Sequence, residues 1–349
     1  MVPKRARRPK AKRWGHYKDR RDWKQYNERL VKRGEIYLSV DFLESWGENL
    51  GRMNRGKVGA PYRYPEPFMA FLGFIHIMLM VDYRGLEGFT RGLGKFALVP
   101  MPDYSTVCRR VNALGLGIRE TLLDHEGEDV VISLDSSGIK VSNRGEWMRE
   151  KWKVHRGWIK VHLAVDRDRK QCVAIEVTDE SVGDQNQFTP LVKEAGRNIR
   201  AKGGRVVQAN ADGIYDTRDN FNTLDEMSIT PGIRIRENAS TRARGCPLRK
   251  RHAREYRELG YRGWRRRYGY GYRWRVEGNL SAVKRLTGEY VAATKKDNMC
   301  REVAMKFLFY NSIIKFDETG QPLWTNGSGR LPIMSNLVPG GGRVHPAGT

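Results

Sequence analysis

The sequence predicts a mixed α/β domain preceded by an all-helical region. From residue 129 onward, short apolar strands alternate with helical segments, whereas residues 36–115 show only helical spacing of apolar residues. The 349 residues suffice for two domains, and a hydrophobic fraction of 39% lies in the globular range. We therefore expect a helical domain at 36–115 and an α/β domain at 129–316.

The net charge of +24 indicates a polyanionic partner. The charge comes from 64 basic and 40 acidic residues and is concentrated in two blocks. Residues 1–35 carry 14 Lys/Arg against 4 Asp/Glu, and residues 234–275 carry 15 against 3. Two cationic blocks on a nearly neutral body predict two places where a phosphate backbone lies, and nucleic acid is the simplest such partner.

The N-terminal block, residues 1–35, interleaves basic residues with aromatic ones. Its first dozen residues have too little apolar surface to bury, which predicts a partly disordered arm that becomes ordered on DNA. A solubilising tail is the alternative. The aromatic residues are Trp14, Tyr17, Trp23 and Tyr26.

The region at 36–115 is expected to form several helices. The almost wholly apolar run at 68–81 predicts a central buried helix. Pro65 and Pro67 suit the first turn of this helix. Further helices are expected over 40–53, from Leu86 to Leu93, and after Asp103. Short helices with small turns fit a helix-turn-helix module that binds DNA, and a helical packing or dimerisation domain is the alternative.

The α/β region predicts a meander of three strands followed by alternating helices and strands. The expected elements are strands at 130–134, 158–165 and 172–177, a helix at 186–199, a strand at 206–211, a helix at 217–227 and a strand at 229–235 broken by Pro231-Gly232. Residues 236–269 are too long and too basic for a connector, and they predict an inserted segment that contacts DNA. An apolar helix at 304–314 closes the domain, and the Gly/Pro/Ser/Asn-rich residues 317–349 predict a mostly disordered tail.

Several other classes of protein are disfavoured. The cysteines are far apart and form no CxxC pair, so they predict reduced thiols and not a zinc or redox site. They are Cys108, Cys172, Cys246 and Cys300. The apolar run at 68–81 is too short for a membrane span, and the N-terminus lacks the apolar segment of a secretory signal. We therefore expect a cytoplasmic protein without membrane contact.

The segment YGYRWRVEGNLSAVK at 270–284 predicts a helix that carries chemistry. At about 100° per residue, an acid, two cations and a phenol share one face beside an apolar stripe. These residues are Tyr270, Arg273, Glu277 and Lys284. They suit a metal ligand with phosphate-binding neighbours, whereas an exposed face with intrahelical ion pairs is the alternative. Because Gly269 and Gly271 disfavour helix, a helix that starts after Tyr270 is a second possibility.

Two aspartates follow separate apolar strands. Asp135 comes after residues 130–134, and Asp212 comes after residues 206–211. Ligands collect at the carboxyl ends of strands in open α/β sheets, so we expect these aspartates to lie together, joined by Glu277. Three clustered carboxylates stay ionised only around divalent cations, and oxygen-only ligands suit Mg²⁺ or Mn²⁺. For each aspartate alone, a turn or helix-cap role is the alternative.

The combined motifs resemble one known family. The spacing Tyr-(2)-Arg-(3)-Glu-(6)-Lys within 270–284 resembles the signature around the catalytic glutamate of DDE transposases of insertion sequences. WRVEGNLSAVKRLTGE at 274–289, DSSGIK at 135–140, ADGIYD at 211–216, YRYPEPFMAFLGFI at 62–75 and PDYSTVCRRVNALG at 102–115 resemble the family-five group in particular. The resemblance covers roughly residues 36–316.

The resemblance implies an RNase H-like fold, catalysis with two Mg²⁺ or Mn²⁺ ions, and cutting and joining of DNA. The implied catalytic and metal-binding residues are Asp135, Asp212 and Glu277. Asp212 is preferred to Asp216 because it directly follows the strand. The residues that would contact phosphates near the cut are Tyr270, Arg273 and Lys284.

The implied partners are the terminal inverted repeats of a mobile element and its target DNA. Joining two ends suggests a homodimer or a larger assembly on DNA, associated with the nucleoid. A nuclease of similar fold that does not join DNA is one alternative. A DNA-binding protein without catalysis is another.

A few further residues are candidates for supporting roles. The cluster Trp264-Arg265-Arg266-Arg267 is expected to contact phosphates through charge and not to read bases. His162 is expected in the core or in support of the site, and pointing into the site is the alternative. Trp147 and Trp152, beside Lys151 and Lys153, could stack on bases that flank the cut, with surface packing as the alternative.

Overall fold

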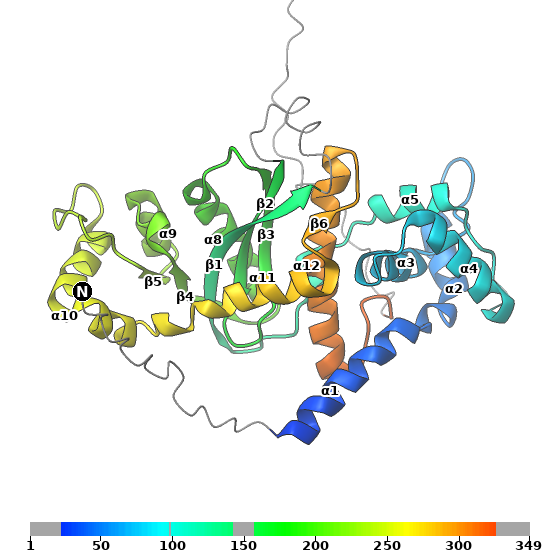
Figure 1. Ribbon diagram of the computed structural model, residues 1–349, viewed down its shortest axis with the longest axis horizontal. Coiled ribbons are helices and arrows are strands. Elements are labelled where there is room, and N and C mark those ends of the chain that lie inside the picture. Colours follow the sequence, from blue (N-terminus) through cyan, green and yellow to red (C-terminus); the bar gives the residue numbers. More distant parts are fainter. Residues whose placement is uncertain (1–21, 98, 142–156, 326–349) are drawn as a thin grey trace, which may run out of the picture.

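The computed structural model describes residues 22–97, 99–141 and 157–325, arranged as a helical region beside a sheet flanked by helices (Figure 1). The expectations for Trp14 and Tyr17 of the arm, for Trp147 and Trp152, and for residues 326–349 lie outside the described residues.

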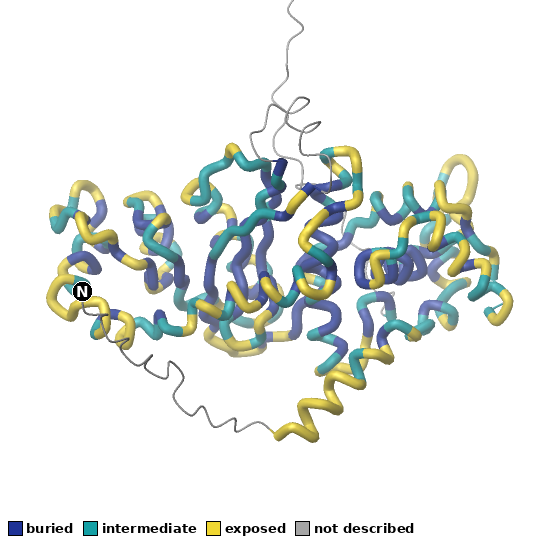
Figure 2. Tube along the Cα trace, in the orientation of Figure 1, coloured by how far each residue is buried: buried dark blue, intermediate teal, exposed yellow. Residues whose placement is uncertain are grey.

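The helical region surrounds one buried helix, as the sequence predicts. Its helices are α1 (Trp23–Glu35), α2 (Trp46–Asn54), α3 (Glu66–Met78), α4 (Tyr83–Ala97), α5 (Tyr104–Asn112) and α6 (Ile118–Thr121), with 3-10 turns η1 (Ile36–Leu38) and η2 (Asp41–Leu43). The apolar helix α3 is buried along most of its length, with Pro65 as its N-cap and Pro67 in its first turn. In contrast, α1 buries none of its residues and extends away from the body (Figure 2). The single helix expected over 40–53 is divided into η2 and α2.

The second region is built on one six-stranded mixed sheet. Its strands are β1 (Asp129–Val141), β2 (Trp158–Asp166), β3 (Cys172–Asp179), β4 (Arg205–Ala211), β5 (Thr230–Ile233) and β6 (Tyr290–Val291). They are ordered β3-β2-β1-β4-β5, and β6 also pairs with β1. β2 is antiparallel to β1 and to β3, whereas β4, β5 and β6 extend the sheet in parallel. The predicted fold class is therefore confirmed.

Helices cover both faces of this sheet. The remaining elements are α8 (Asp184–Arg200), η3 (Gly213–Tyr215), α9 (Arg218–Glu226), α10 (Pro247–Arg267), η4 (Tyr270–Tyr272), α11 (Trp274–Thr287) and α12 (Lys296–Thr319). A side chain at the start of α11 reaches Asp135 of β1, whereas α8 contacts His162 of β2, which is paired with Ser136. Because successive side chains of a strand point to opposite faces, α8 and α11 lie on opposite sides of the sheet.

Two strands differ from their predicted limits. β1 does not end before Asp135 but continues to Val141, because β2 pairs with it in an antiparallel hairpin as far as Lys140. Pro231 and Gly232 do not break β5. β5 is the last strand on that side of the sheet, so the missing N–H of proline leaves no partner unsatisfied.

The closing helix α12 is longer than the apolar pattern indicated, because it buries two charged residues that have dedicated partners. The Glu302 carboxylate accepts hydrogen bonds from the backbone N–H groups of Ala292 and Ala293. The Lys306 ammonium donates to backbone carbonyls at the end of α11 and in β6, including Thr287 at 2.6 Å. Buried charges are tolerated when they are paired in this way, and here they hold β6 against α12.

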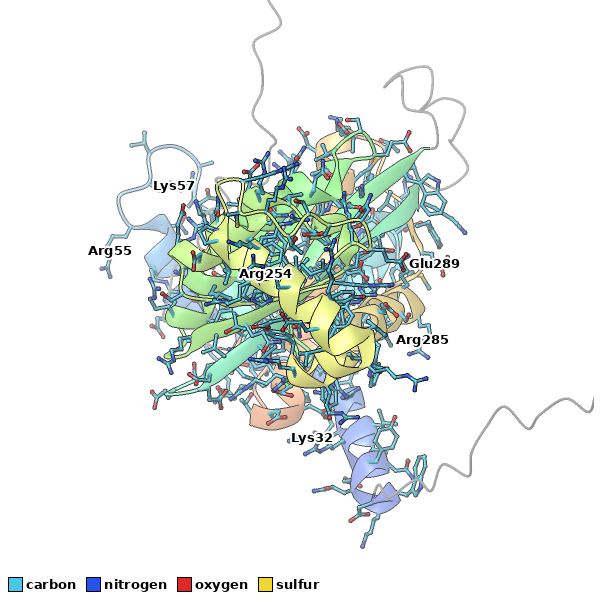
Figure 3. All side chains as sticks on the ribbon, turned by 90° about the vertical axis from the view of Figure 1, so that its left-hand side faces the viewer. Lys32, Arg55, Lys57, Arg254, Arg285 and Glu289 are labelled. Carbon is cyan, nitrogen blue, oxygen red and sulfur yellow. The ribbon has the colours of Figure 1, made fainter. Side chains whose placement is uncertain are left out.

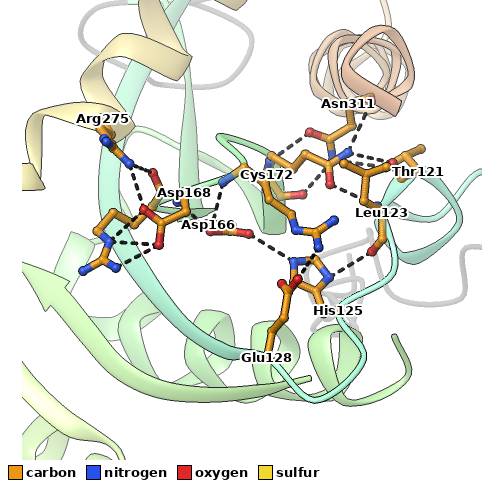
Figure 4. Close-up of polar contacts among 12 residues, drawn as sticks. Thr121, Leu123, His125, Glu128, Asp166, Asp168, Cys172, Arg275 and Asn311 are labelled. Atoms are coloured by element: carbon orange, nitrogen blue, oxygen red, sulfur yellow. Dashed lines mark hydrogen bonds and ion pairs between the residues drawn. The ribbon is translucent and has the colours of Figure 1, made fainter. Parts of the chain in front are cut away.

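One hydrophobic core connects the two regions. α12 stands between them and packs against α3 and β3 (Figure 1). Its Asn311 side chain accepts a hydrogen bond from the backbone N–H of Cys172 at 2.8 Å and donates to the backbone carbonyl of Cys172 at 2.7 Å. Nearby, a buried His125 contacts Asp166 at 3.0 Å (Figure 4). The predicted helical and α/β domains thus pack as neighbours around shared apolar residues.

Residues 317–325, the start of the predicted tail, are folded. α12 continues to Thr319, and Trp324 is buried against the rings of Phe71 and Phe74 of α3, with centroids 5.4 and 5.1 Å away. The Trp324 indole donates to the Ser39 carbonyl at 3.0 Å. This segment therefore closes the core of the helical region. Within the described ranges, no helix has the length and apolar character of a membrane span, and the four cysteines are free thiols.

Trp324→Ala should lower the free energy of unfolding by about 3–5 kcal/mol, because it leaves a cavity against α3 and an unpaired Ser39 carbonyl. Urea unfolding followed by circular dichroism measures the change. Phe96→Ala, which removes an exposed ring of α4, is the control and should leave stability nearly unchanged. Equal stability of the two variants would contradict the role assigned to Trp324.

Candidate active site

The fold brings the three predicted acids to one face of the sheet. Asp135 lies within β1, Asp212 directly follows β4 and caps η3 by accepting the Ile214 N–H at 2.9 Å, and Glu277 is in the first turn of α11. The parallel register of β1 and β4 places Ser133 opposite Asn210. Two residues further on, Asp135 and Asp212 therefore stand level with each other and on the same face.

Arg273 links two of these acids. Its guanidinium donates to Glu277 Oε1 at 2.7 Å and lies 3.5 Å from Asp135 Oδ2. Arg273 immediately precedes α11, so it is one helical turn before Glu277. The residue therefore provides positive charge at the point where the negative charges meet.

The other two acids are close enough to Asp135 to influence its pKa. Burial raises the pKa of Asp135, and the negative charges of Asp212 and Glu277 raise it further. The Ser136 N–H and Arg273 act in the opposite direction. Within the described ranges, no three acidic, His or Cys side chains are spaced to hold a metal ion, and Arg273 supplies the counter-charge between Asp135 and Glu277.

Lys284 approaches the same face of the sheet two turns further along α11. Its ammonium donates to Ser137 Oγ at 2.9 Å, and Ser137 is two residues beyond Asp135 on β1. Arg273, directly before α11, and Lys284, near its end, therefore both contact β1 on the face that carries Asp135.

Tyr270 is not part of the same helix, so the interpretation of 270–284 as one helix is wrong. Gly269 adopts a left-handed conformation with φ 57°, Tyr270 lies in η4, and α11 begins only at Trp274. The Tyr270 ring is buried against Trp264, with centroids 4.9 Å apart. Burial raises the pKa of Tyr270 to about 12, and the charges of Arg273 and Asp212 also act on it. The phenol therefore reaches the site from the turn that precedes α11.

The basic segment 236–269 is held to the sheet by Asp216. This buried carboxylate pairs with Arg249 of α10, at 2.6 and 2.9 Å, and accepts the backbone N–H of Arg236. Asp216 is thus occupied by structural contacts, whereas Asp212 faces the other acids. Arg265, Arg266 and Arg267 are exposed at the end of α10. Figure 3 looks onto the end of the molecule where this helix lies and labels its Arg254.

His162 lies on the face of the sheet opposite α11. It is fully buried, its Nε2 contacts Thr178 Oγ1 at 2.9 Å, and its Nδ1 lies 3.4 Å from Asp184. Burial lowers the pKa of His162 to about 4, so the ring is neutral at pH 7. Asp184 also pairs with Lys160 at 2.7 Å. His162 is therefore a core residue beside β1, and nothing in the periodicity of α8 marked Asp184 as its neighbour.

Two models of known protein families match this chain. Residues 126–312 match the family "Transposase DDE domain", and residues 31–144 match a second family of the same description. The first match covers more than half of the chain, so the chain belongs to the DDE transposases.

Two solved structures are similar to the chain. One is a piggyBac transposase synaptic complex with hairpin DNA, with 10% identity, a TM-score of 0.35, and coverage of 83% of this chain and 74% of that chain. The other is a Drosophila P element transposase strand transfer complex, with 12% identity, a TM-score of 0.28, and coverage of 55% of this chain and 42% of that chain.

Asp135→Asn should raise the melting temperature of the metal-free protein at pH 8. Because the pKa of Asp135 is raised in the folded state, ionised Asp135 destabilises that state above the unfolded-chain pKa of about 3.9. The gain should therefore be largest at neutral and higher pH and disappear as the pH falls below about 4. Thermal melts in EDTA at several pH values measure it.

The exposed Asp219 of α9 provides the matched control, since Asp219→Asn should shift the melting temperature little at any pH. A lower melting temperature of Asp135→Asn at pH 8 would mean that the pairing with Arg273 outweighs burial and repulsion.

Proposed function

We propose that this chain is a transposase that cleaves phosphodiesters at the inverted-repeat ends of an insertion sequence and joins the freed 3′-hydroxyl ends to target DNA. The observation that carries the proposal is the convergence of Asp135, Asp212 and Glu277 in one electrostatic site, in a chain of the DDE transposase family. Such a constellation has no packing purpose, because close carboxylates repel one another.

The donor set fits divalent cations. The three acids offer only oxygen ligands, and the pKa of Asp135 is raised first by burial and further by the charges of Asp212 and Glu277, which a bound cation would offset. In this proposal, Asp135, Asp212 and Glu277 hold two Mg²⁺ or Mn²⁺ ions. When bound, the ions supply activation of the attacking oxygen and stabilisation of the leaving oxygen.

The neighbouring residues then position the DNA. Arg273 neutralises Asp135 and Glu277 in the metal-free protein, and once cations replace it there, its planar fork is free to grip a phosphate with two donors. Lys284 offers a point charge beside β1. Tyr270, which remains protonated because its pKa is about 12, donates a hydrogen bond from its hydroxyl.

The charge distribution supports two surfaces for DNA. The insertion at 236–269 presents Arg265, Arg266 and Arg267 close in sequence to Tyr270 and the site. The helical domain at 36–115 and the basic arm at 1–35 provide the second surface, where Arg84 of α4 lies over the ring of Tyr104 at the start of α5. We propose that this second surface binds the element end, that the domain at 129–316 performs the chemistry, and that a homodimer or larger assembly joins two ends at the nucleoid.

Asp135→Asn, Asp212→Asn and Glu277→Gln should each reduce DNA cleavage by roughly 10³-fold or more, because each removes an anionic ligand from a shared metal site. The assay uses a labelled duplex that carries the element end, with Mg²⁺ or with EDTA. Asp219→Asn is the control and should retain activity. Products longer than the substrate demonstrate strand transfer.

Two results would overturn this proposal. Products that are only shorter than the substrate would identify a nuclease that does not join DNA. A wild-type protein that binds the duplex but is as inactive as Asp135→Asn would identify a DNA-binding protein without catalysis.

Replacing Arg265, Arg266 and Arg267 with Ala should weaken DNA binding equally for element-end and shuffled sequences. The slope of log K against log salt should decrease by about 0.9 for each phosphate that the variant no longer neutralises. Fluorescence anisotropy at several salt concentrations measures the slope. Arg205→Ala, at the opposite end of β4, is the control and should not change it. An effect limited to the element-end sequence would show that these residues read bases.

A further inference from the structure

Three small residues lie side by side on neighbouring strands, in the row before the two aspartates. The registers of β1 with β4 and of β4 with β5 align Ser133, Asn210 and Gly232 across three strands. Ser133 and Asn210 are fully buried and precede Asp135 and Asp212 by two residues, so they point to the same face. They form the floor of the candidate active site.

The orientation of the Asn210 amide is fixed by its neighbours. Gln208 Nε2 donates to the Tyr268 carbonyl at 2.6 Å and to Asn210 Oδ1 at 2.7 Å. A backbone carbonyl can only accept, so Gln208 must present its amino group to Tyr268. The same amino group then faces Asn210, which must present its oxygen. The amino group Nδ2 of Asn210 is consequently the branch that points away from Gln208.

Gly232 shows on which side the oxygen lies. A Cβ atom at residue 232 would be 1.9 Å from Asn210 Oδ1, a distance that no side chain can accommodate. The amide oxygen therefore occupies the space above Gly232, on the β5 side. Nδ2 lies on the opposite branch, toward β1 and the row of acids.

Two buried donors on this floor lack acceptors. Among the described residues, neither Asn210 Nδ2 nor Ser133 Oγ has a hydrogen-bond partner. Buried polar groups without partners destabilise a fold, and most are satisfied by protein or by ordered water. Two residues further along the two segments, on the same face, stand the nearest anionic acceptors, the carboxylates of Asp135 and Asp212. Unpartnered donors in the row before these aspartates are suited to orienting their carboxylates through hydrogen bonds.

We propose that Asn210 is a positioning residue for the metal-binding acids: together with Ser133 it holds a buried water that donates a hydrogen bond to the Asp135 carboxylate and orients it for the ions. This inference rests on the proposed function. A water needs two to four polar partners, and Asn210 Nδ2, Ser133 Oγ and Asp135 provide three. Partners behind a metal ligand typically change metal affinity by about 10–100-fold when they are removed.

The test compares metal binding with folding stability in the full chain without DNA. Asn210→Leu removes the donor with little change in volume. Mn²⁺ affinity, measured by electron paramagnetic resonance, should fall by about 10–100-fold. The melting temperature in EDTA should stay equal or rise, because an unsatisfied buried donor has been removed. A merely structural role predicts the opposite pair of results, a lower melting temperature with unchanged Mn²⁺ affinity, and would overturn the proposal.

Ser133→Ala provides a smaller change if Asn210→Leu does not fold, and it should also weaken Mn²⁺ binding. Because both donors act on one water, the double variant should be no weaker than Asn210→Leu alone. Additive effects would overturn the shared water. The buried Asn279 of α11, which donates to the Lys170 carbonyl, supplies the control variant Asn279→Leu, whose Mn²⁺ affinity should match wild type.

Asp135→Asn separates this inference from the proposed function. If wild type and Asp135→Asn bind Mn²⁺ equally, the acids do not form the metal site and the proposed function fails. If only Asp135→Asn loses Mn²⁺ while Asn210→Leu binds as wild type does, the metal site stands and the role of Asn210 is disproved.

Discussion

The gathering of three carboxylates around the partly buried Asp135 is the constraint on which the candidate site depends. Asp135, Asp212 and Glu277 come from two strands and a helix, and the fold brings them close enough for each to affect the pKa of Asp135. That proximity is destabilising unless positive charge is present. Arg273 provides it by contacting Asp135 and Glu277 from one turn before the glutamate. The site thus has a built-in counter-ion, and in the proposed function divalent cations would take its place and leave the guanidinium free to bind a phosphate.

The rest of the sheet region holds these charges in place. The parallel pairing of β1 with β4 sets Asp135 and Asp212 level, and the antiparallel hairpin of β1 with β2 keeps Asp135 inside a strand, where its backbone cannot move freely. Val276, Leu280 and Val283 bury one stripe of α11, and Lys284 of the same helix donates to Ser137 of β1. Asp216 anchors the basic segment 236–269 through Arg249, and this contact does not use the three candidate acids.

The helical region is joined to this site through α12. The same helix packs on α3 and on β3, and its buried Lys306 holds the carbonyls where α11 ends and β6 begins. Packed side chains of this continuous core thus connect the helical region to the end of α11 that carries Lys284.

The sequence alone determined the fold class, the order of most strands and helices, the two cationic blocks and the DDE resemblance, because periodicity and charge are properties of neighbouring residues. It also marked Asp135, Asp212 and Glu277 as the candidate acids. Only the tertiary structure decided that Asp135 lies within a strand, that Asp216 is committed to Arg249, that Tyr270 precedes the helix, and that Glu302 and Lys306 are buried with partners. Each of these depends on contacts between segments far apart in the chain, and the spacing of residues along one segment carries no information about the register or partner that another segment supplies.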